Sequence, residues 1–261
     1  MKPHHSRVVE LLVKRFGSDE SFLALMIGGS IARGWERDDS DVDFLLIASN
    51  EEYEKRKAAR SFHYYATDLC DYPGGYVDGK ILDLQFLEDV ANRGSEVARS
   101  AFVGVQVAYS RLNELDELLG RITTYPEEDR LEKIRSFFAH MRAYQWYVGE
   151  AEKLKNDYLM SRSVNELILY GGRMILAYNR IFFPFHKWFL QTLKDAREKP
   201  SDLLERIDDL LARPSKDNAD RFCESISGFR DWETPAEGWP ARFMEDTEWA
   251  WRRGQAPLSD W

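Results

Sequence analysis

The sequence predicts a fold of the mixed α/β (α+β) class, with strands and helices in the first half of the chain and helices in the second. Two short apolar runs, at residues 22–27 and 42–47, have the length and composition of buried strands. From about residue 127 onward, apolar residues recur at spacings of three and four, as on packed helices. The 261 residues are enough for two domains of ordinary size. We therefore expect domains at residues 1–120 and 121–261.

The first domain is expected to contain helices between its strands. Apolar residues at helical spacing over residues 6–17 predict a first helix, and the charged stretch 51–60 predicts another. At residues 77–86, Asp78 and Gly79 have the composition of a tight turn, and the residues after them alternate in polarity. This last segment is expected to form a β-hairpin.

Composition excludes several classes of protein. The chain has 45 acidic and 36 basic residues and a formal net charge of -9, which argues against non-specific binding of duplex nucleic acid and suits a cationic small molecule better. The two cysteines, Cys70 and Cys223, do not have the spacing of a zinc site, and a reducing compartment is the simpler interpretation. No export signal or membrane-spanning run is visible, so we expect a cytoplasmic protein that does not bind membranes.

The segment between the two predicted strands carries the most chemical information. The first strand ends in Gly28, Gly29 and Ser30, and a short helix that begins there would present backbone N–H groups to a phosphate. Asp41 and Asp43 are two residues apart at the start of the second strand, so their side chains lie on the same face. Two such carboxylates favour a Mg²⁺ site beside a triphosphate.

A third carboxylate is expected from the segment that follows Ile81. Leu82 and Leu84 would face one side of a strand and Asp83 the other. A neighbouring strand would then bring Asp83 to the same metal ions. Arg33, three residues after Ser30, would add a cation near the phosphates.

These residues resemble the DNA polymerase β-like nucleotidyltransferase superfamily. Its signature is G-[GS], about ten residues, D-h-D and a later acidic residue, and here Gly29-Ser30, ten residues, Asp41-Val42-Asp43 and Asp83 match it. The resemblance covers roughly residues 20–90. The helical second half is similar, in architecture alone, to that of the aminoglycoside and lincosamide adenylyltransferases of antibiotic resistance.

The resemblance implies a small mixed sheet and transfer of a nucleoside monophosphate with release of pyrophosphate. ATP is the expected nucleoside triphosphate, although another is open, and the acceptor is a hydroxyl of a small molecule such as an aminoglycoside. Gly29 and Ser30 would cradle the phosphates, and Asp41 and Asp43 would bridge two Mg²⁺ ions. Asp83 would bind the catalytic ion and help to deprotonate the acceptor.

Further candidates lie in the helical half, which we expect to meet the first domain at a cleft. Glu150 and Glu166 are candidates for a general base, because such relatives supply a carboxylate from this half; a surface position on a helix is the better interpretation for each. Arg180 and Lys187, in an aromatic segment, would bind triphosphate oxygens, with core packing as the alternative for the rings.

Two features of this half have open interpretations. Arg135 and His140 have the R-x₄-H spacing of HEPN ribonucleases, but a chance match is the better explanation in a chain so rich in arginine. The tail at residues 232–261, rich in Trp and Pro, is expected to pack along the helices or against a partner subunit in a homodimer. The remaining alternatives for function are modification of a protein or an RNA end, and a non-catalytic nucleotide-binding module.

Overall fold

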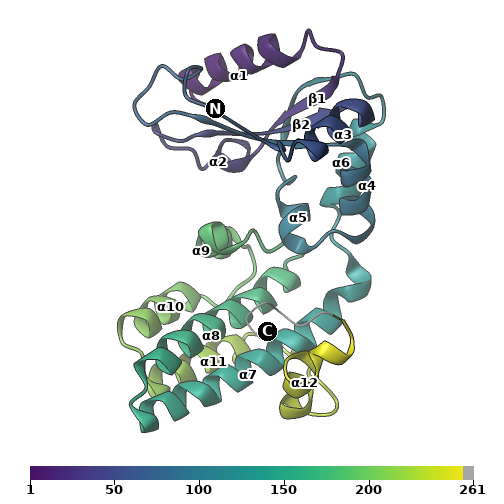
Figure 1. Ribbon diagram of the computed structural model, residues 1–261. Coiled ribbons are helices and arrows are strands. Elements are labelled where there is room, and N and C mark those ends of the chain that lie inside the picture. The colour runs from purple at the N-terminus through teal and green to yellow at the C-terminus, as the bar shows by residue number, and fades with distance from the viewer. Residues whose placement is uncertain (255–261) are drawn as a thin grey trace. The chain divides into compact units, whose positions relative to one another are not determined.

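The computed structural model describes residues 1–254 (Figure 1). The chain divides into two compact units, Met1–Thr124 and Tyr125–Trp261. The boundary expected after residue 120 falls inside helix α6 (Leu115–Thr123), which packs against helix α4 (Leu84–Arg93) of the first unit. Because a helix packs as a whole, all of α6 belongs to the first unit.

One mixed sheet organises the first unit. Within the described residues it has five strands in the order β3-β4-β2-β1-β5. The pair β2 and β4 is parallel, and the other neighbouring pairs are antiparallel. The strands are β1 (Phe22–Ile27), β2 (Val42–Ala48), β3 (His63–Ala66), β4 (Val77–Leu82) and β5 (Gln106–Ser110). The class of fold and the two apolar strands expected from the sequence are therefore confirmed.

Helices cover both faces of this sheet. Helix α1 (Pro3–Phe16) packs Leu12 and Phe16 against Phe44 and Leu46 of β2 in one buried cluster. Leu45 lies on the opposite face, in a second cluster with α4 and α6. The alternation along β2 thus sends neighbouring residues into different cores. Two shorter helices, α2 (Gly29–Ala32) and α3 (Asn50–Ala58), flank β2 in the sequence (Figure 1).

The segment expected to be a hairpin is one strand followed by a helix. Strand β4 runs without a turn through Asp78 and Gly79, and α4 begins at Leu84. Gly79 is required for a different reason, because a Cβ atom there would lie 2.1 Å from Cζ of Phe44. The hairpin prediction was wrong since the glycine accommodates a ring from another strand and does not form a turn.

A buried arginine links the ends of three helices in the first unit. Arg99, in α5 (Glu96–Ser100), is 8% exposed and donates to the carbonyl oxygens of Ala91, Gly94, Arg121 and Ile122. Ala91 lies near the carboxyl end of α4, and Ile122 near that of α6, where carbonyl groups lack partners within the helix.

Replacement of Arg99 by Met is expected to lower the free energy of unfolding of the first unit by about 2–3 kcal/mol. The methionine fills similar space but leaves the buried carbonyl oxygens without donors. Urea unfolding measures the change. Arg93→Met is the matched control, because Arg93 forms an exposed ion pair with Asp89. An equal loss in both variants would show that Arg99 is not a structural link.

The second unit is helical, as the sequence predicts. The long helices α7 and α8 pack along each other, and α11 packs against both. The buried side chains of these helices form one core that includes Met141, Leu167 and Phe222. The helices are α7 (Arg130–Leu154), α8 (Asp157–Tyr178), α9 (His186–Asp195), α10 (Leu203–Ala212), α11 (Lys216–Gly228) and α12 (Trp239–Asp246), with single 3₁₀ turns at Glu127–Asp129 and Ala250–Arg252.

The aromatic tail packs against the helical unit over its described part. Trp232 joins the edge of the core and donates from Nε1 to the carbonyl oxygen of Ile226 at 2.7 Å. Helix α12 packs on α7. Residues 255–261 of this tail lie outside the described residues.

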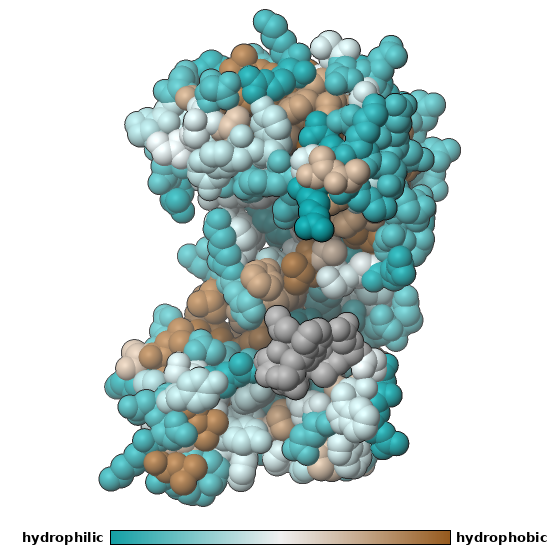
Figure 2. Space-filling model, in the orientation of Figure 1, coloured by the Kyte–Doolittle hydropathy of each residue, from teal (hydrophilic) through white to brown (hydrophobic). Residues whose placement is uncertain are grey.

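The surface of the second unit is not uniformly polar. Leu154, Tyr158 and Phe185 are more than half exposed. On the face shown in Figure 2, brown apolar groups lie between hydrophilic side chains of this unit. No helix within residues 1–254 combines the length and apolar character needed to cross a membrane.

Candidate functional site

The turn after β1 brings backbone close to a carboxylate of β2. Gly28 donates from its backbone N to the carbonyl oxygen of Asp43 at 2.9 Å, and Gly29 begins α2 with a φ of +61°. A Cβ atom on Gly29 would lie 1.8 Å from Oδ2 of Asp43. Both the backbone conformation and the close approach therefore require glycine at this position. Ser30, which follows, is buried.

Asp78 is the carboxylate that lies beside Asp43 in the sheet. The two residues are direct partners in the parallel pair of β2 and β4. Parallel partners point to the same face, and adjacent strands are about 4.8 Å apart. Asp41, two residues before Asp43, belongs to the same face. Asp41, Asp43 and Asp78 thus form an acidic face, which we call the carboxylate face.

Asp83 does not lie on the carboxylate face. It follows the end of β4 and caps α4, where its Oδ1 accepts from the backbone N of Phe86 at 2.8 Å. It is five residues beyond Asp78, which corresponds to about 16 Å along a strand. The expectation that Asp83 joins Asp41 and Asp43 is therefore wrong, because the strand ends before it.

Sequence analysis missed Asp78 although a signal was present. Val77, Gly79 and Ile81 alternate with polar residues, as in a strand with one buried face. The Asp-Gly pair is typical of hairpin turns, so the segment was interpreted as a turn and not as a continuous strand.

The pKa of Tyr76 is raised by the negative charges of the carboxylate face. Its backbone oxygen accepts from the N of Val42 at 3.0 Å, which places it beside the start of β2. A hydrogen bond to the Asp41 carboxylate, with the negative charge of that group, raises the pKa of Tyr76 to about 12. The charges of Asp43 and Asp78 act in the same direction. All three carboxylates therefore act on one hydroxyl group.

The carboxylate face offers oxygen ligands of the kind that Mg²⁺ binds. Among residues 1–254, no group of three or more His, Cys, Asp or Glu side chains is arranged to hold a metal ion. Mg²⁺ commonly binds through one or two carboxylates together with substrate phosphates. The carboxylates of Asp43 and Asp78, direct partners on adjacent strands, are chemically suited to that mode.

Arg33 forms hydrogen bonds within the first unit. Its Nη2 atom donates to the backbone oxygen of Ser100 at 2.5 Å and to Oγ of the same residue at 2.7 Å. Its guanidinium group also lies 5.2 Å from the ring centre of Trp35. These contacts hold Arg33 at the end of α5, and its role as a phosphate-binding cation stays a prediction.

The candidates in the helical unit make contacts within that unit. Glu150 pairs with Lys153 at 2.6 Å, Glu166 with Arg162 at 3.0 Å, and Arg180 with Glu127. The ammonium group of Lys187 lies 5.4 Å from the ring centre of Trp188. Such ion pairs agree with the alternative interpretation, in which these residues are surface charges on helices. A role for these four candidates in nucleotide or acceptor binding stays a prediction.

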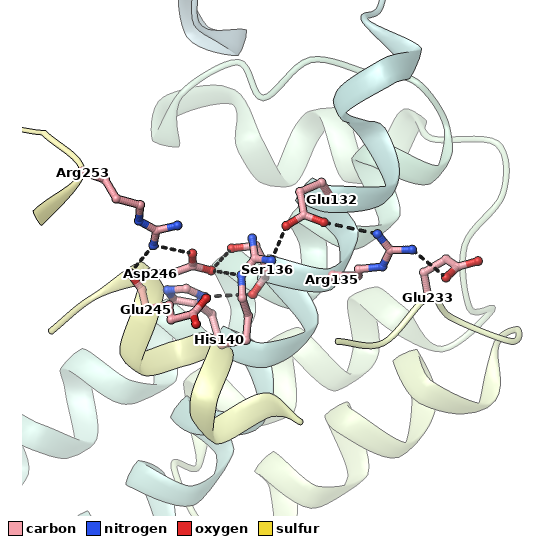
Figure 3. A network of polar contacts seen from close by, with 9 residues as sticks. Glu132, Arg135, Ser136, His140, Glu233, Glu245, Asp246 and Arg253 are labelled. Atoms are coloured by element: carbon pink, nitrogen blue, oxygen red, sulfur yellow. Dashed lines mark hydrogen bonds and ion pairs between the residues drawn. The ribbon is translucent and has the colours of Figure 1, made fainter. Parts of the chain in front are cut away.

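The R-x₄-H pair belongs to a network that joins α7 and α12 (Figure 3). Arg135 forms ion pairs with Glu132 at 3.2 Å and Glu233 at 3.3 Å. His140 is 5% exposed, and its Nδ1 donates to the carbonyl oxygen of Ser136, 2.8 Å away. Ser136 in turn bonds to Asp246 of α12. The imidazole of His140 is thus buried and bonds within α7, which favours the chance-match interpretation.

The buried His140 predicts a pH dependence for the helical unit. Burial lowers the pKa of His140 below its usual 6.5. The unfolded chain therefore binds more protons than the folded one as the pH falls below about 6.5, and the free energy of unfolding falls with it. Urea unfolding followed by tryptophan fluorescence should give lower midpoints at about pH 5.5 than at pH 7.5. In His140→Gln this difference should shrink; an unchanged difference would contradict the assignment.

The fold and the site define a mixed α+β chain with an acidic sheet face next to a glycine turn. Comparisons with known proteins give one family model and similar solved structures. A family model described as a domain of unknown function (DUF4037) matches residues 96–189. The chain is also similar to the crystal structure of a nucleotidyltransferase-like protein from Exiguobacterium sibiricum, with 11% identity and a TM-score of 0.47, over 95% of this chain and 79% of that one. No curated protein matches the sequence. The carboxylate face precedes the segment matched by the family model.

Proposed function

We propose that the protein is a Mg²⁺-dependent nucleotidyltransferase that transfers a nucleoside monophosphate, AMP from ATP, to a hydroxyl group of a small acceptor. The observation that carries this proposal is the placement of Asp43 beside Asp78 and against Gly29. The three carboxylates of the carboxylate face offer hard oxygen ligands, and the adjacent glycine turn lets phosphate groups approach the backbone.

Each residue of the site has a part in this reaction. Asp41, Asp43 and Asp78 would hold Mg²⁺, which when bound neutralises charge on the triphosphate and polarises the reacting phosphorus. Gly29 and Ser30 would bind phosphate oxygens through their backbone N–H groups. Phosphoryl transfer depends mainly on positioning and charge neutralisation, so this set is chemically sufficient for the nucleotide half of the reaction.

The charge of the chain bears on the acceptor of the proposed reaction. A formal net charge of -9 suits a cationic, hydroxylated compound such as an aminoglycoside. A macromolecular acceptor would require the same carboxylates, and a panel of small acceptors distinguishes the two classes.

The test is acceptor-dependent release of pyrophosphate. The full-length protein is incubated with Mg²⁺, each of the four ribonucleoside triphosphates, and a panel of aminoglycosides, lincosamides and cyclic polyols. Release that requires an acceptor and is lost in Asp41→Asn would support the proposal. Calorimetry of Mg²⁺ with a non-hydrolysable ATP analogue gives a second measurement. Absence of both release and nucleotide binding would refute the proposed enzyme.

A further inference from the structure

A row of aromatic side chains extends the carboxylate face to the edge of the sheet. It consists of Tyr76, Tyr65 and His63, and we call it the aromatic row. The ring centres of Tyr65 and Tyr76 are 5.3 Å apart, and those of His63 and Tyr65 are 6.5 Å apart. In each pair the ring planes are inclined by 34°. The rings thus form a continuous surface rather than isolated contacts.

The pairing of the strands fixes where this row lies. Tyr65 of β3 is the direct partner of Asp78 of β4, which is the partner of Asp43. These three residues therefore form a line across three strands, and Tyr65 is about 10 Å from Asp43. Strand β3 is an edge strand, and Nε2 of His63 on it lies 3.2 Å from Oδ2 of Asp78.

The aromatic row is not part of the hydrophobic core. Tyr64 and Ala66, the alternate residues of β3, pack against the core under the sheet. Tyr65 is 58% exposed, and the His63 side chain is 60% exposed. Core packing therefore does not account for the aromatic character of these positions, whereas a ligand that lies on them would.

The geometry of phosphoryl transfer indicates the side of the site from which the acceptor approaches. In phosphoryl transfer the attacking and leaving oxygens lie roughly in line on opposite sides of the phosphorus. If the phosphates lie over Gly29, next to β1 and β2, the leaving pyrophosphate is on that side. The attacking hydroxyl must then approach from the opposite side, over Asp78 and the edge strand β3.

We propose that the aromatic row is the acceptor subsite and that it takes a small, ring-shaped, hydroxylated molecule, a sugar, aminosugar or cyclitol. This inference rests on the proposed function. One ring of the acceptor lies on the exposed face of Tyr65, and one of its hydroxyl groups reaches the carboxylate of Asp78. A single six-membered ring with its substituents spans the distance from Tyr65 to the metal-binding carboxylates. The residues that select the acceptor thus lie on the edge strand of the first unit.

The test measures binding of ring compounds independently of turnover. Saturation-transfer NMR is recorded for myo-inositol, glucosamine and kanamycin with the full-length protein, Mg²⁺ and a non-hydrolysable ATP analogue. The variants are Tyr65→Thr, which keeps strand propensity but removes the ring, and Tyr65→Phe, which keeps the ring. Tyr158→Ala is the matched control, because Tyr158 is a more exposed tyrosine, at 80%, on a helix of the second unit.

The proposal expects at least one compound to bind the wild type, with affinity reduced tenfold or more in Tyr65→Thr and unchanged in Tyr65→Phe and Tyr158→Ala. For a compound that supports turnover, Tyr65→Thr should raise the KM for the acceptor and leave the KM for the nucleotide unchanged. Absence of ring binding, or equal binding by Tyr65→Thr, would overturn the subsite. Ring binding without any pyrophosphate release would instead refute the proposed reaction and leave the subsite standing.

Discussion

Asp78→Asn is expected to lower the rate of acceptor-dependent pyrophosphate release at least a thousandfold, and the same loss is expected for Asp41→Asn. The change keeps the shape of the side chain but removes one negative charge and one strong metal-binding oxygen from the carboxylate face. A thousandfold loss corresponds to about 4 kcal/mol of transition-state stabilisation, which is within the several kcal/mol that a correctly held metal ion supplies. Initial rates at saturating Mg²⁺ and nucleotide measure the effect.

Asp83→Asn is the matched control for this experiment. It makes the same chemical change five residues further along the chain, and Asn replaces Asp well at the amino end of a helix. The rate should stay within a few-fold of the wild type. A large loss in Asp83→Asn combined with a small loss in Asp78→Asn would show that the acidic residue in the later segment, and not the partner of Asp43, completes the site.

Gly29→Ala is expected to reduce the rate of pyrophosphate release at least a hundredfold. The new Cβ atom would overlap Oδ2 of Asp43 and lie only 2.6 Å from its Cγ, so the carboxylate must leave its position. The positive φ of residue 29 adds about 1–2 kcal/mol of backbone strain. Both rate measurements and urea unfolding are needed, because the two effects act on different quantities.

Gly34→Ala separates the effect of backbone strain from the effect of the clash with Asp43. Gly34 has a φ of +70°, but a Cβ atom on it would meet nothing within 4 Å. This variant should therefore lose a similar amount of stability, about 1–2 kcal/mol, and keep most of its activity. Equal rates of pyrophosphate release in the two variants would mean that the approach of Gly29 to Asp43 is not important for catalysis.

The sequence predicted the local parts of this site and missed the part that depends on distant pairing. The apolar strands β1 and β2, the glycine turn, and Asp41 and Asp43 are encoded within a short segment, so periodicity and spacing were sufficient to find them. Asp78 acquires its place only when β4 pairs with β2, and its neighbour Gly79 is required by the ring of Phe44. The contact between Gly79 and this ring cannot be predicted from the sequence of the β4 segment alone.

Arg33 illustrates the same limit for a charged residue. Its sequence position beside the glycine turn suggested a ligand-binding cation, but its partner Ser100 lies 67 residues later in the chain. The acidic candidates of the helical unit, by contrast, have their partners three or four residues away, and helical spacing alone would have predicted those pairs.

The close packing of Gly29 against Asp43 has a thermodynamic consequence for substrate binding. A carboxylate held by a neighbouring backbone is already ordered when the nucleotide arrives, so the loss of its rotational freedom belongs to folding and not to association. Binding at such a preorganised site carries a smaller entropic penalty than binding at a carboxylate free to rotate in solvent. Relief of this packing would therefore appear in calorimetry as a less favourable entropy of association.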